Sequence, residues 1–172
     1  MGDFVCETLE VNPAGHLSVG GCDCLDLARE FGTPLYVMDE MAVRANCRAF
    51  RQAVETCYGA GGKVIYASKA LCTKAILSIM HQEGIGVDVV SGGELATALA
   101  AGVPADTLMY HGNFKTLAEI RQGLAAGVGR FVVDNRLELD QLSGLCKETG
   151  RKADVLFRVK PGIDAHTHDY VL

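Results

Sequence analysis

The sequence lacks three features that would assign it to a membrane, to secretion or to nucleic acid. No apolar stretch approaches the roughly 20 residues that a transmembrane helix needs. The first residues carry neither the basic region nor the apolar core of a secretory signal, so we expect a cytoplasmic protein. There is no basic run, and 16 Lys and Arg against 21 Asp and Glu leave a net charge of −5. This balance argues against a nucleic-acid partner and against an anionic membrane surface.

The sequence also lacks a convincing metal site. Its seven cysteines are scattered and odd in number. Cys22 and Cys24 are the only close pair, and no second pair or nearby histidine completes a zinc set. Cys47 and Cys57 lie on the expected apolar face of a helix, where a thiol behaves as a small hydrophobic group. The histidines of residues 166–168 alternate in an extended segment and point in opposite directions. We therefore expect reduced, structural thiols and no metal.

Five short apolar runs recur along the chain, with starts 21 to 24 residues apart. Each is apolar at successive positions, which is typical of a strand buried on both faces of a parallel sheet. The runs occupy residues 64–67, 87–90, 108–110, 131–133 and 155–159. Helix patterns fill the intervals, at residues 73–84, 91–102, 116–127 and 135–150. Strands and helices that alternate in this way form βα repeats, so the fold class is α/β with a parallel sheet.

Local capping signals accompany these helices. Ser91 and Glu94 form a capping-box pattern, in which the serine accepts the N–H of the glutamate and the carboxylate reaches back to the start of the helix. Capping by itself explains Glu94, and we assign it no function. Asn135 begins the last helix in the same way. Ahead of the repeats, residues 34–38 are predicted as a strand, and Asp39 as the cap of the helix that follows.

The number of repeats limits the architecture and locates the chemistry. A closed barrel of eight βα units usually takes about 250 residues. Five units in 172 residues therefore predict a small open sheet or an incomplete barrel. In both architectures ligands bind at the carboxyl ends of the strands. The polar residues that follow the runs include Ser68 and Lys69, Ser91, residues 111–113, Asp134 and Asn135, and residues 160–162.

Three charged residues break the apolar pattern. Lys69 ends the first run beside apolar walls, where desolvation favours the neutral amine that imine formation with an aldehyde requires. The alternative is a lysine that extends from a strand end to solvent. Asp88 and Arg158 lie within predicted strands, where a charge is costly unless it is paired or directed at a polar ligand. They form either a structural pair with each other or part of a ligand site.

Several segments together resemble a known family. The segments are 34–37 (PLYV), 66–70 (YASKA), 86–95 (GVDVVSGGEL), 111–113 (HGN) and 158–168 (RVKPGIDAHTH). In this order they are similar to the amino-terminal part of the diaminopimelate decarboxylase family, which belongs to the pyridoxal-phosphate enzymes of the alanine racemase-like barrel group. The resemblance runs from about residue 34 to the end of the chain.

The resemblance implies roles for four residues. Lys69 matches the lysine that forms an imine with pyridoxal 5′-phosphate, Asp88 matches an aspartate beside this cofactor, and Arg158 matches an arginine near its ring. His111 lies in a motif that lines the same cofactor site at the carboxyl ends of the strands. The implied reaction is the loss of carbon dioxide from the D-configured centre of meso-2,6-diaminopimelate, which gives L-lysine as the last step of its biosynthesis.

The resemblance also implies a fold and an assembly. Residues 34–172 would be an incomplete cofactor-binding domain, a partial (β/α)8 TIM barrel of the alanine racemase-like type with about five of its eight βα units. Residues 1–33 would belong to a second, β-rich domain. The family's phosphate cradle, its substrate-binding residues and the cysteine that one protomer of a homodimer contributes to its partner would lie beyond Leu172. We therefore expect the chain to be a fragment or a truncated product that is inactive alone.

Two alternative functions remain open. Decarboxylases of ornithine, arginine or carboxyspermidine share the lysine-bearing strand and the aspartate, although they differ around the SGGEL and HGN segments. A non-catalytic barrel homologue acting as a binding partner is the other alternative. Retention of Lys69 argues against it, because such a protein needs no imine-forming amine.

Overall fold

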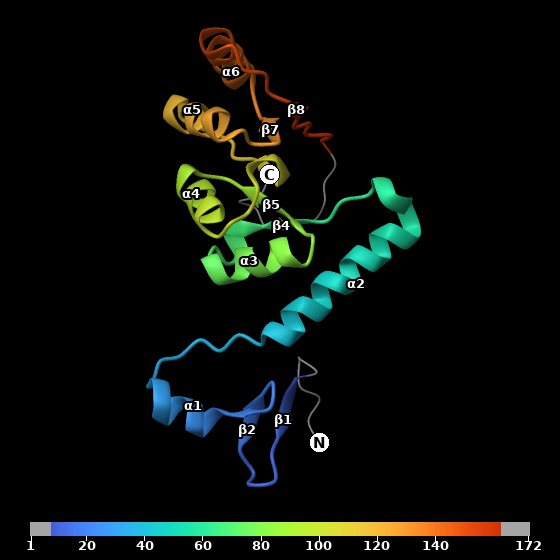
Figure 1. The fold of residues 1–172 in the computed structure, drawn as a ribbon, viewed down its shortest axis with the longest axis vertical. Helices are drawn as coiled ribbons and strands as arrows, with labels where there is room; N and C mark the ends of the chain where they lie inside the picture. The colour runs from blue at the N-terminus through green and yellow to red at the C-terminus, as the bar shows by residue number, and fades with distance from the viewer. Residues whose placement is uncertain (1–7, 163–172) are drawn as a thin grey trace. The chain divides into compact units, whose positions relative to one another are not determined.

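The computed structural model describes residues 8–162. The chain divides into two compact units, Met1–Val64 and Ile65–Leu172, and Figure 1 labels most of their helices and strands. Within the described range no helix is both long and apolar enough to cross a membrane.

The first unit contains a small antiparallel sheet and two helices. The strand order is β1 (Leu9–Val11), β2 (Leu17–Val19), β3 (Cys22–Asp23). The helices are α1 (Cys24–Phe31), α2 (Glu40–Tyr58) and the short 3₁₀ helix η1 (Gly59–Gly61). Asp23 and Asp39 precede α1 and α2, and each carboxylate accepts backbone N–H groups of the first turn. The prediction that Asp39 caps a helix is confirmed.

The predicted strand at residues 34–38 is wrong. This segment has no regular secondary structure. A strand is held by hydrogen bonds to a neighbouring strand, and none of the strands within residues 8–162 pairs with this segment. Its β-type composition therefore did not suffice to make it a strand.

The second unit contains the five predicted strands and the four predicted helices between them. Its parallel sheet has the strand order β4 (Ile65–Ala67), β5 (Gly86–Val89), β6 (Leu108–Tyr110), β7 (Arg130–Val133), β8 (Val155–Phe157). The helices are α3 (Lys74–Gln82), α4 (Gly92–Ala100), α5 (Leu117–Ala126) and α6 (Arg136–Thr149). Two 3₁₀ helices complete it, η2 (Ser68–Ala70) and η3 (Ala105–Thr107). The α/β fold with a parallel sheet is confirmed.

Helices α3 to α6 follow one another along one side of this sheet (Figure 1). The core lies between them and the strands, where Val87 and Val89 of β5 and Leu95 of α4 are fully buried. Each such side chain stabilises the fold by about 1.5–3 kcal/mol through the apolar surface it removes from water. Asp88 points to the other face of β5 because successive side chains of a strand alternate.

Burial on both faces, which the sequence predicted for every strand, holds for β7 but not for β8. Phe131, Val132 and Val133 are all buried, whereas Leu156 is 41% and Phe157 62% exposed. Among the described residues, β8 is the last strand of the sheet and has a neighbouring strand only on the β7 side. The strand is also shorter than predicted, since it ends at Phe157. Arg158 therefore follows the strand instead of lying within it.

Candidate active site

The sheet register places the four predicted site residues at one edge. Ala67, Asp88 and Met109 are neighbours across β4, β5 and β6. Lys69 follows the end of β4 by two residues. The N–H of His111 donates to the carbonyl of Val89 at 2.8 Å, and the N–H of Arg158 donates to that of Val133 at 2.9 Å. Because the strands are parallel, all four residues lie at or just beyond their carboxyl ends.

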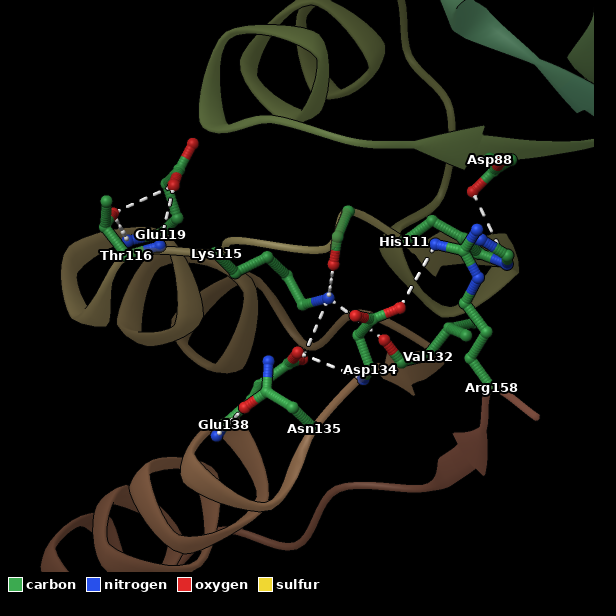
Figure 2. Close-up of polar contacts among 11 residues, drawn as sticks. Asp88, His111, Lys115, Thr116, Glu119, Val132, Asp134, Asn135, Glu138 and Arg158 are labelled. Carbon is green, nitrogen blue, oxygen red and sulfur yellow. Dashed lines mark hydrogen bonds and ion pairs between the residues drawn. The ribbon is translucent and has the colours of Figure 1, made fainter. Parts of the chain in front are cut away.

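Asp88 faces His111 across the ends of β5 and β6 (Figure 2). Oδ1 of Asp88 is 3.9 Å from Nε2 of His111, and the side chains are 18% and 38% exposed. This oxygen is buried and has no hydrogen-bond partner among the described residues. Burial raises the pKa of Asp88, and the charges of His111 and Lys69 act in the opposite direction. A buried oxygen without a partner fits a polar ligand at this edge.

Arg158 pairs with Asp134 and not with Asp88. Its Nη1 donates to Oδ1 of Asp134 at 3.1 Å, and both side chains are partly exposed. The prediction that Asp88 and Arg158 form a structural pair with each other is therefore wrong. Asp134 was among the polar residues expected at the carboxyl ends of the strands, but no partner was predicted for it. An open hollow of about 210 Å³ lies beside this pair, lined by residues 133–136, Leu139, Phe157 and Arg158.

Lys69 lies in η2, the turn that directly follows β4. Its side chain is exposed, so the described residues do not supply the apolar walls that the sequence predicted around it. The preceding residue is held firmly: Ser68 is fully buried, and its hydroxyl donates to Oε2 of Glu94 at 2.7 Å. The backbone that carries the amine is thus anchored while the side chain remains accessible.

Glu94 does more than the predicted capping. Ser91 Oγ accepts the N–H of Glu94 at 3.3 Å, as expected. The carboxylate, however, accepts the N–H of Val90 at 2.8 Å and the hydroxyl of Ser68, so it joins α4 to the preceding repeat. The view that capping alone explains this residue is therefore wrong.

A complete capping box is found at the start of α5. Thr116 and Glu119 exchange hydrogen bonds in both directions, with the Thr116 hydroxyl accepting at 3.2 Å and the Glu119 carboxylate accepting at 2.9 Å. Glu119 also accepts the N–H of Gly92 at 2.8 Å, which links α5 to the start of α4. These contacts hold the pKa of Glu119 below its usual range, chiefly through the Gly92 N–H.

Lys115 and Glu138 form a buried ion pair that the sequence reasoning missed. Nζ of Lys115 is 2.8 Å from Oε1 of Glu138, and the two side chains are only 1% and 5% exposed. Lys115 Nζ also lies 5.7 Å from the centroid of the Tyr110 ring. No local pattern marks this lysine, because its burial results from the packing of α5 and α6 against the sheet.

The thiols are only partly as predicted. Cys47 is buried, whereas Cys57 is exposed, since a helical apolar face is buried only where another element covers it. None of the six cysteines within residues 8–162 forms a disulfide. In the same range no three His, Cys, Asp or Glu side chains gather as a metal site. Cys6, His166 and His168 lie outside the described residues.

The chain is similar to known proteins over most of its length. It is 48% identical over 168 residues to diaminopimelate decarboxylase of Bacillus subtilis, a match that covers 98% of this chain and 38% of the relative. The crystal structure of diaminopimelate decarboxylase from M. jannaschii with L-lysine superposes with a TM-score of 0.82 at 37% identity, covering 96% of this chain and 38% of that one. A lysine/ornithine decarboxylase of Vibrio vulnificus in complex with putrescine gives a TM-score of 0.68 at 29% identity, over 78% and 35% of the chains.

The chain thus spans about 38% of the length of the relatives it matches. The family model described as "pyridoxal-dependent decarboxylase, pyridoxal binding domain" matches residues 40–172, which include the five-stranded parallel sheet and its polar edge. The chain therefore belongs to the pyridoxal-dependent decarboxylase family, and pyridoxal phosphate is the cofactor of the domain it carries.

Proposed function

We propose that the complete natural protein decarboxylates meso-2,6-diaminopimelate to L-lysine with pyridoxal 5′-phosphate. The observation that carries this proposal is the placement of Lys69, Asp88 and Arg158 at one edge of a parallel sheet. The names of the similar proteins support the substrate, because one is diaminopimelate decarboxylase of B. subtilis and another is a diaminopimelate decarboxylase with L-lysine bound.

The residues at this edge fit the cofactor. Lys69 offers an accessible amine to the cofactor's aldehyde. Asp88 offers a carboxylate oxygen that has no partner among the described residues. His111 lies 3.9 Å from it, and Arg158 is partly exposed at the same edge of the sheet. The bound cofactor supplies an electron sink for the pair of electrons left when the carbon–carboxylate bond breaks. The protein's part is to orient that bond and to balance charge around the ring.

The assembly and location are also proposals. The five parallel strands would be part of an eight-stranded barrel. Residues 1–33, with their separate antiparallel sheet, would belong to a β-rich second domain. The protein would act as a cytoplasmic homodimer with a small-molecule substrate.

A second candidate is a decarboxylase for ornithine, arginine or carboxyspermidine. The likeness to the V. vulnificus lysine/ornithine decarboxylase favours it, because that enzyme shares the fold at a TM-score of 0.68. Release of carbon dioxide from each amino acid by the purified natural protein distinguishes the two. Release from meso-diaminopimelate alone supports the first proposal, and release from ornithine or arginine alone contradicts it.

The role of Lys69 is tested by borohydride trapping. The complete protein is incubated with pyridoxal phosphate, treated with borohydride and digested with a protease, and the masses of the peptides are measured by mass spectrometry. We expect the added mass on the peptide that contains Lys69 and a loss of yellow absorbance in Lys69→Ala. Lys63→Ala, which removes another exposed lysine just ahead of β4, is the matched control and should behave as wild type. Equal absorbance in Lys69→Ala and wild type would contradict the assignment.

A further inference from the structure

The buried Lys115–Glu138 pair has no part in the proposed chemistry. Neither residue belongs to the predicted site, and each is almost completely removed from solvent. A buried ion pair adds little net stability, because the loss of hydration of both charges offsets much of their attraction. A gain in stability therefore does not by itself account for the pair, and its other contacts are informative.

Lys115 restrains the loop that carries His111. In addition to its ion pair with Glu138, its ammonium donates hydrogen bonds to the carbonyl of Gly112 at 2.8 Å and to that of Val132 at 3.0 Å. The ammonium thus makes two hydrogen bonds to backbone carbonyls and one ion pair, with Oε1 of Glu138. Because Gly112 directly follows His111, the lysine ties the peptide next to this site residue to the end of β7.

Glu138 restrains the neighbouring strand end. Its Oε2 accepts the N–H of Asp134 at 3.2 Å, and Asp134 in turn binds Arg158. Figure 2 shows the ammonium of Lys115 directed at the carboxylate of Glu138, with Asp134 next to the pair. The Lys115–Glu138 ion pair thus connects the backbone next to His111 with the backbone of Asp134.

We propose that Lys115 and Glu138 are positioning residues, which hold His111 and Asp134 in the geometry that binds the cofactor. This inference rests on the proposed function. A misplacement of about 1 Å at a reacting site can cost about 100-fold in rate. The Lys115–Glu138 pair can therefore matter for function even though it adds little to the net stability of the fold.

The test separates positioning from stability in the complete natural protein. Glu138→Gln removes the charge at nearly constant volume. The double variant Lys115→Met/Glu138→Leu replaces the pair by apolar side chains. Leu145→Ala, which truncates a buried side chain in the second half of α6, is the matched destabilising control. The readouts are the Kd of pyridoxal phosphate, the Tm of the cofactor-free protein, and hydrogen exchange in residues 111–116.

We expect Glu138→Gln to weaken pyridoxal phosphate binding by about tenfold or more and to speed exchange in residues 111–116. Leu145→Ala should lower Tm with no change in Kd. The double variant should recover Tm but not affinity, because its side chains make no hydrogen bonds to residues 112, 132 and 134. If Glu138→Gln does not fold, the double variant provides the test, because its Kd for pyridoxal phosphate should be weaker than that of wild type although its Tm is recovered.

Two results would overturn the inference while leaving the proposed function intact. One is wild-type Kd in Glu138→Gln or in the double variant. The other is a loss of affinity in Leu145→Ala that is as large, for the same drop in Tm, as the loss in Glu138→Gln. This result would mean that the pair only stabilises the fold. Failure of the wild-type protein itself to bind pyridoxal phosphate would instead contradict the proposed function.

Discussion

Arg158 donates a hydrogen bond to Asp134 at 3.1 Å and so joins the ends of the neighbouring strands β7 and β8. Asp88 faces His111 instead, at 3.9 Å. The edge of the sheet therefore carries two separate polar pairs, and within residues 8–162 no arginine pairs with the carboxylate of Asp88. A ligand at this edge meets an aspartate oxygen whose hydrogen-bonding capacity is still available among the described residues.

Loss of the Asp134 carboxylate should affect ligand binding more than stability. In Asp134→Asn the Arg158 guanidinium loses its charged partner, and we expect weaker binding of pyridoxal phosphate. Because the side chains are 49% and 24% exposed, the free energy of unfolding should fall by only about 0.2–1 kcal/mol. Titration with the cofactor and urea denaturation measure the two effects. Asp140→Asn, which breaks the exposed pair with Arg136, should leave binding unchanged; an equal loss in both variants would contradict this prediction.

Asp88 should destabilise the cofactor-free protein at neutral pH. Burial raises its folded-state pKa above the ordinary 3.8, so the folded state binds the proton more tightly than the unfolded state does. Its contribution to stability is therefore full below about pH 3.8 and is lost as the pH rises through the raised pKa. We expect Asp88→Asn to have a higher Tm than wild type at pH 7, with the difference shrinking at acid pH. Thermal unfolding of the cofactor-free proteins at several pH values checks this, and a lower Tm at pH 7 would contradict it.

His16 should control the titration of Asp23 in the first unit. Nδ1 of His16 lies 2.8 Å from Oδ2 of Asp23, and this contact is the largest cause that lowers the pKa of Asp23 to about 2. The stabilising effect of the ionised group is present above pH 3.8 and is lost as the pH falls towards 2. NMR titration of the Asp23 carboxyl carbon should show a higher midpoint in His16→Ala. An unchanged midpoint would mean that the Asn12 and backbone contacts suffice.

Gly112 should be intolerant of a side chain. Its φ is +105°, and a Cβ would come within 2.7 Å of the Val90 carbonyl oxygen. Gly112→Ala should therefore lower the free energy of unfolding by about 1–3 kcal/mol, as measured by urea denaturation. At Gly144 in α6, by contrast, a Cβ would meet no neighbouring side chain of the described residues within 4 Å. Gly144→Ala is accordingly the opposite control and should stabilise by roughly 0.5–1 kcal/mol; a stabilising Gly112→Ala would contradict the expected strain.

The elements of the second unit were predictable because their signals are local. A buried strand such as β7 appears in the sequence as consecutive apolar residues, and the side chains that cap helices, such as Ser91 and Asn135, precede them directly. Errors arose where an element depends on a neighbour. Residues 34–38 have strand-like composition but no pairing strand among the described residues, and Cys57 lies on an apolar face that is exposed.

The sequence by itself determined the repeat of strands and helices, and with it the edge where Lys69, Asp88, His111 and Arg158 are placed, because parallel strands bring their carboxyl ends together. Only the tertiary structure decided which groups contact one another. Lys115 and Glu138, like Asp134 and Arg158, are separated by about one repeat, and this spacing alone does not tell which side chains of neighbouring repeats pair. Their contacts follow from strand register and helix packing, which are set by the whole sheet.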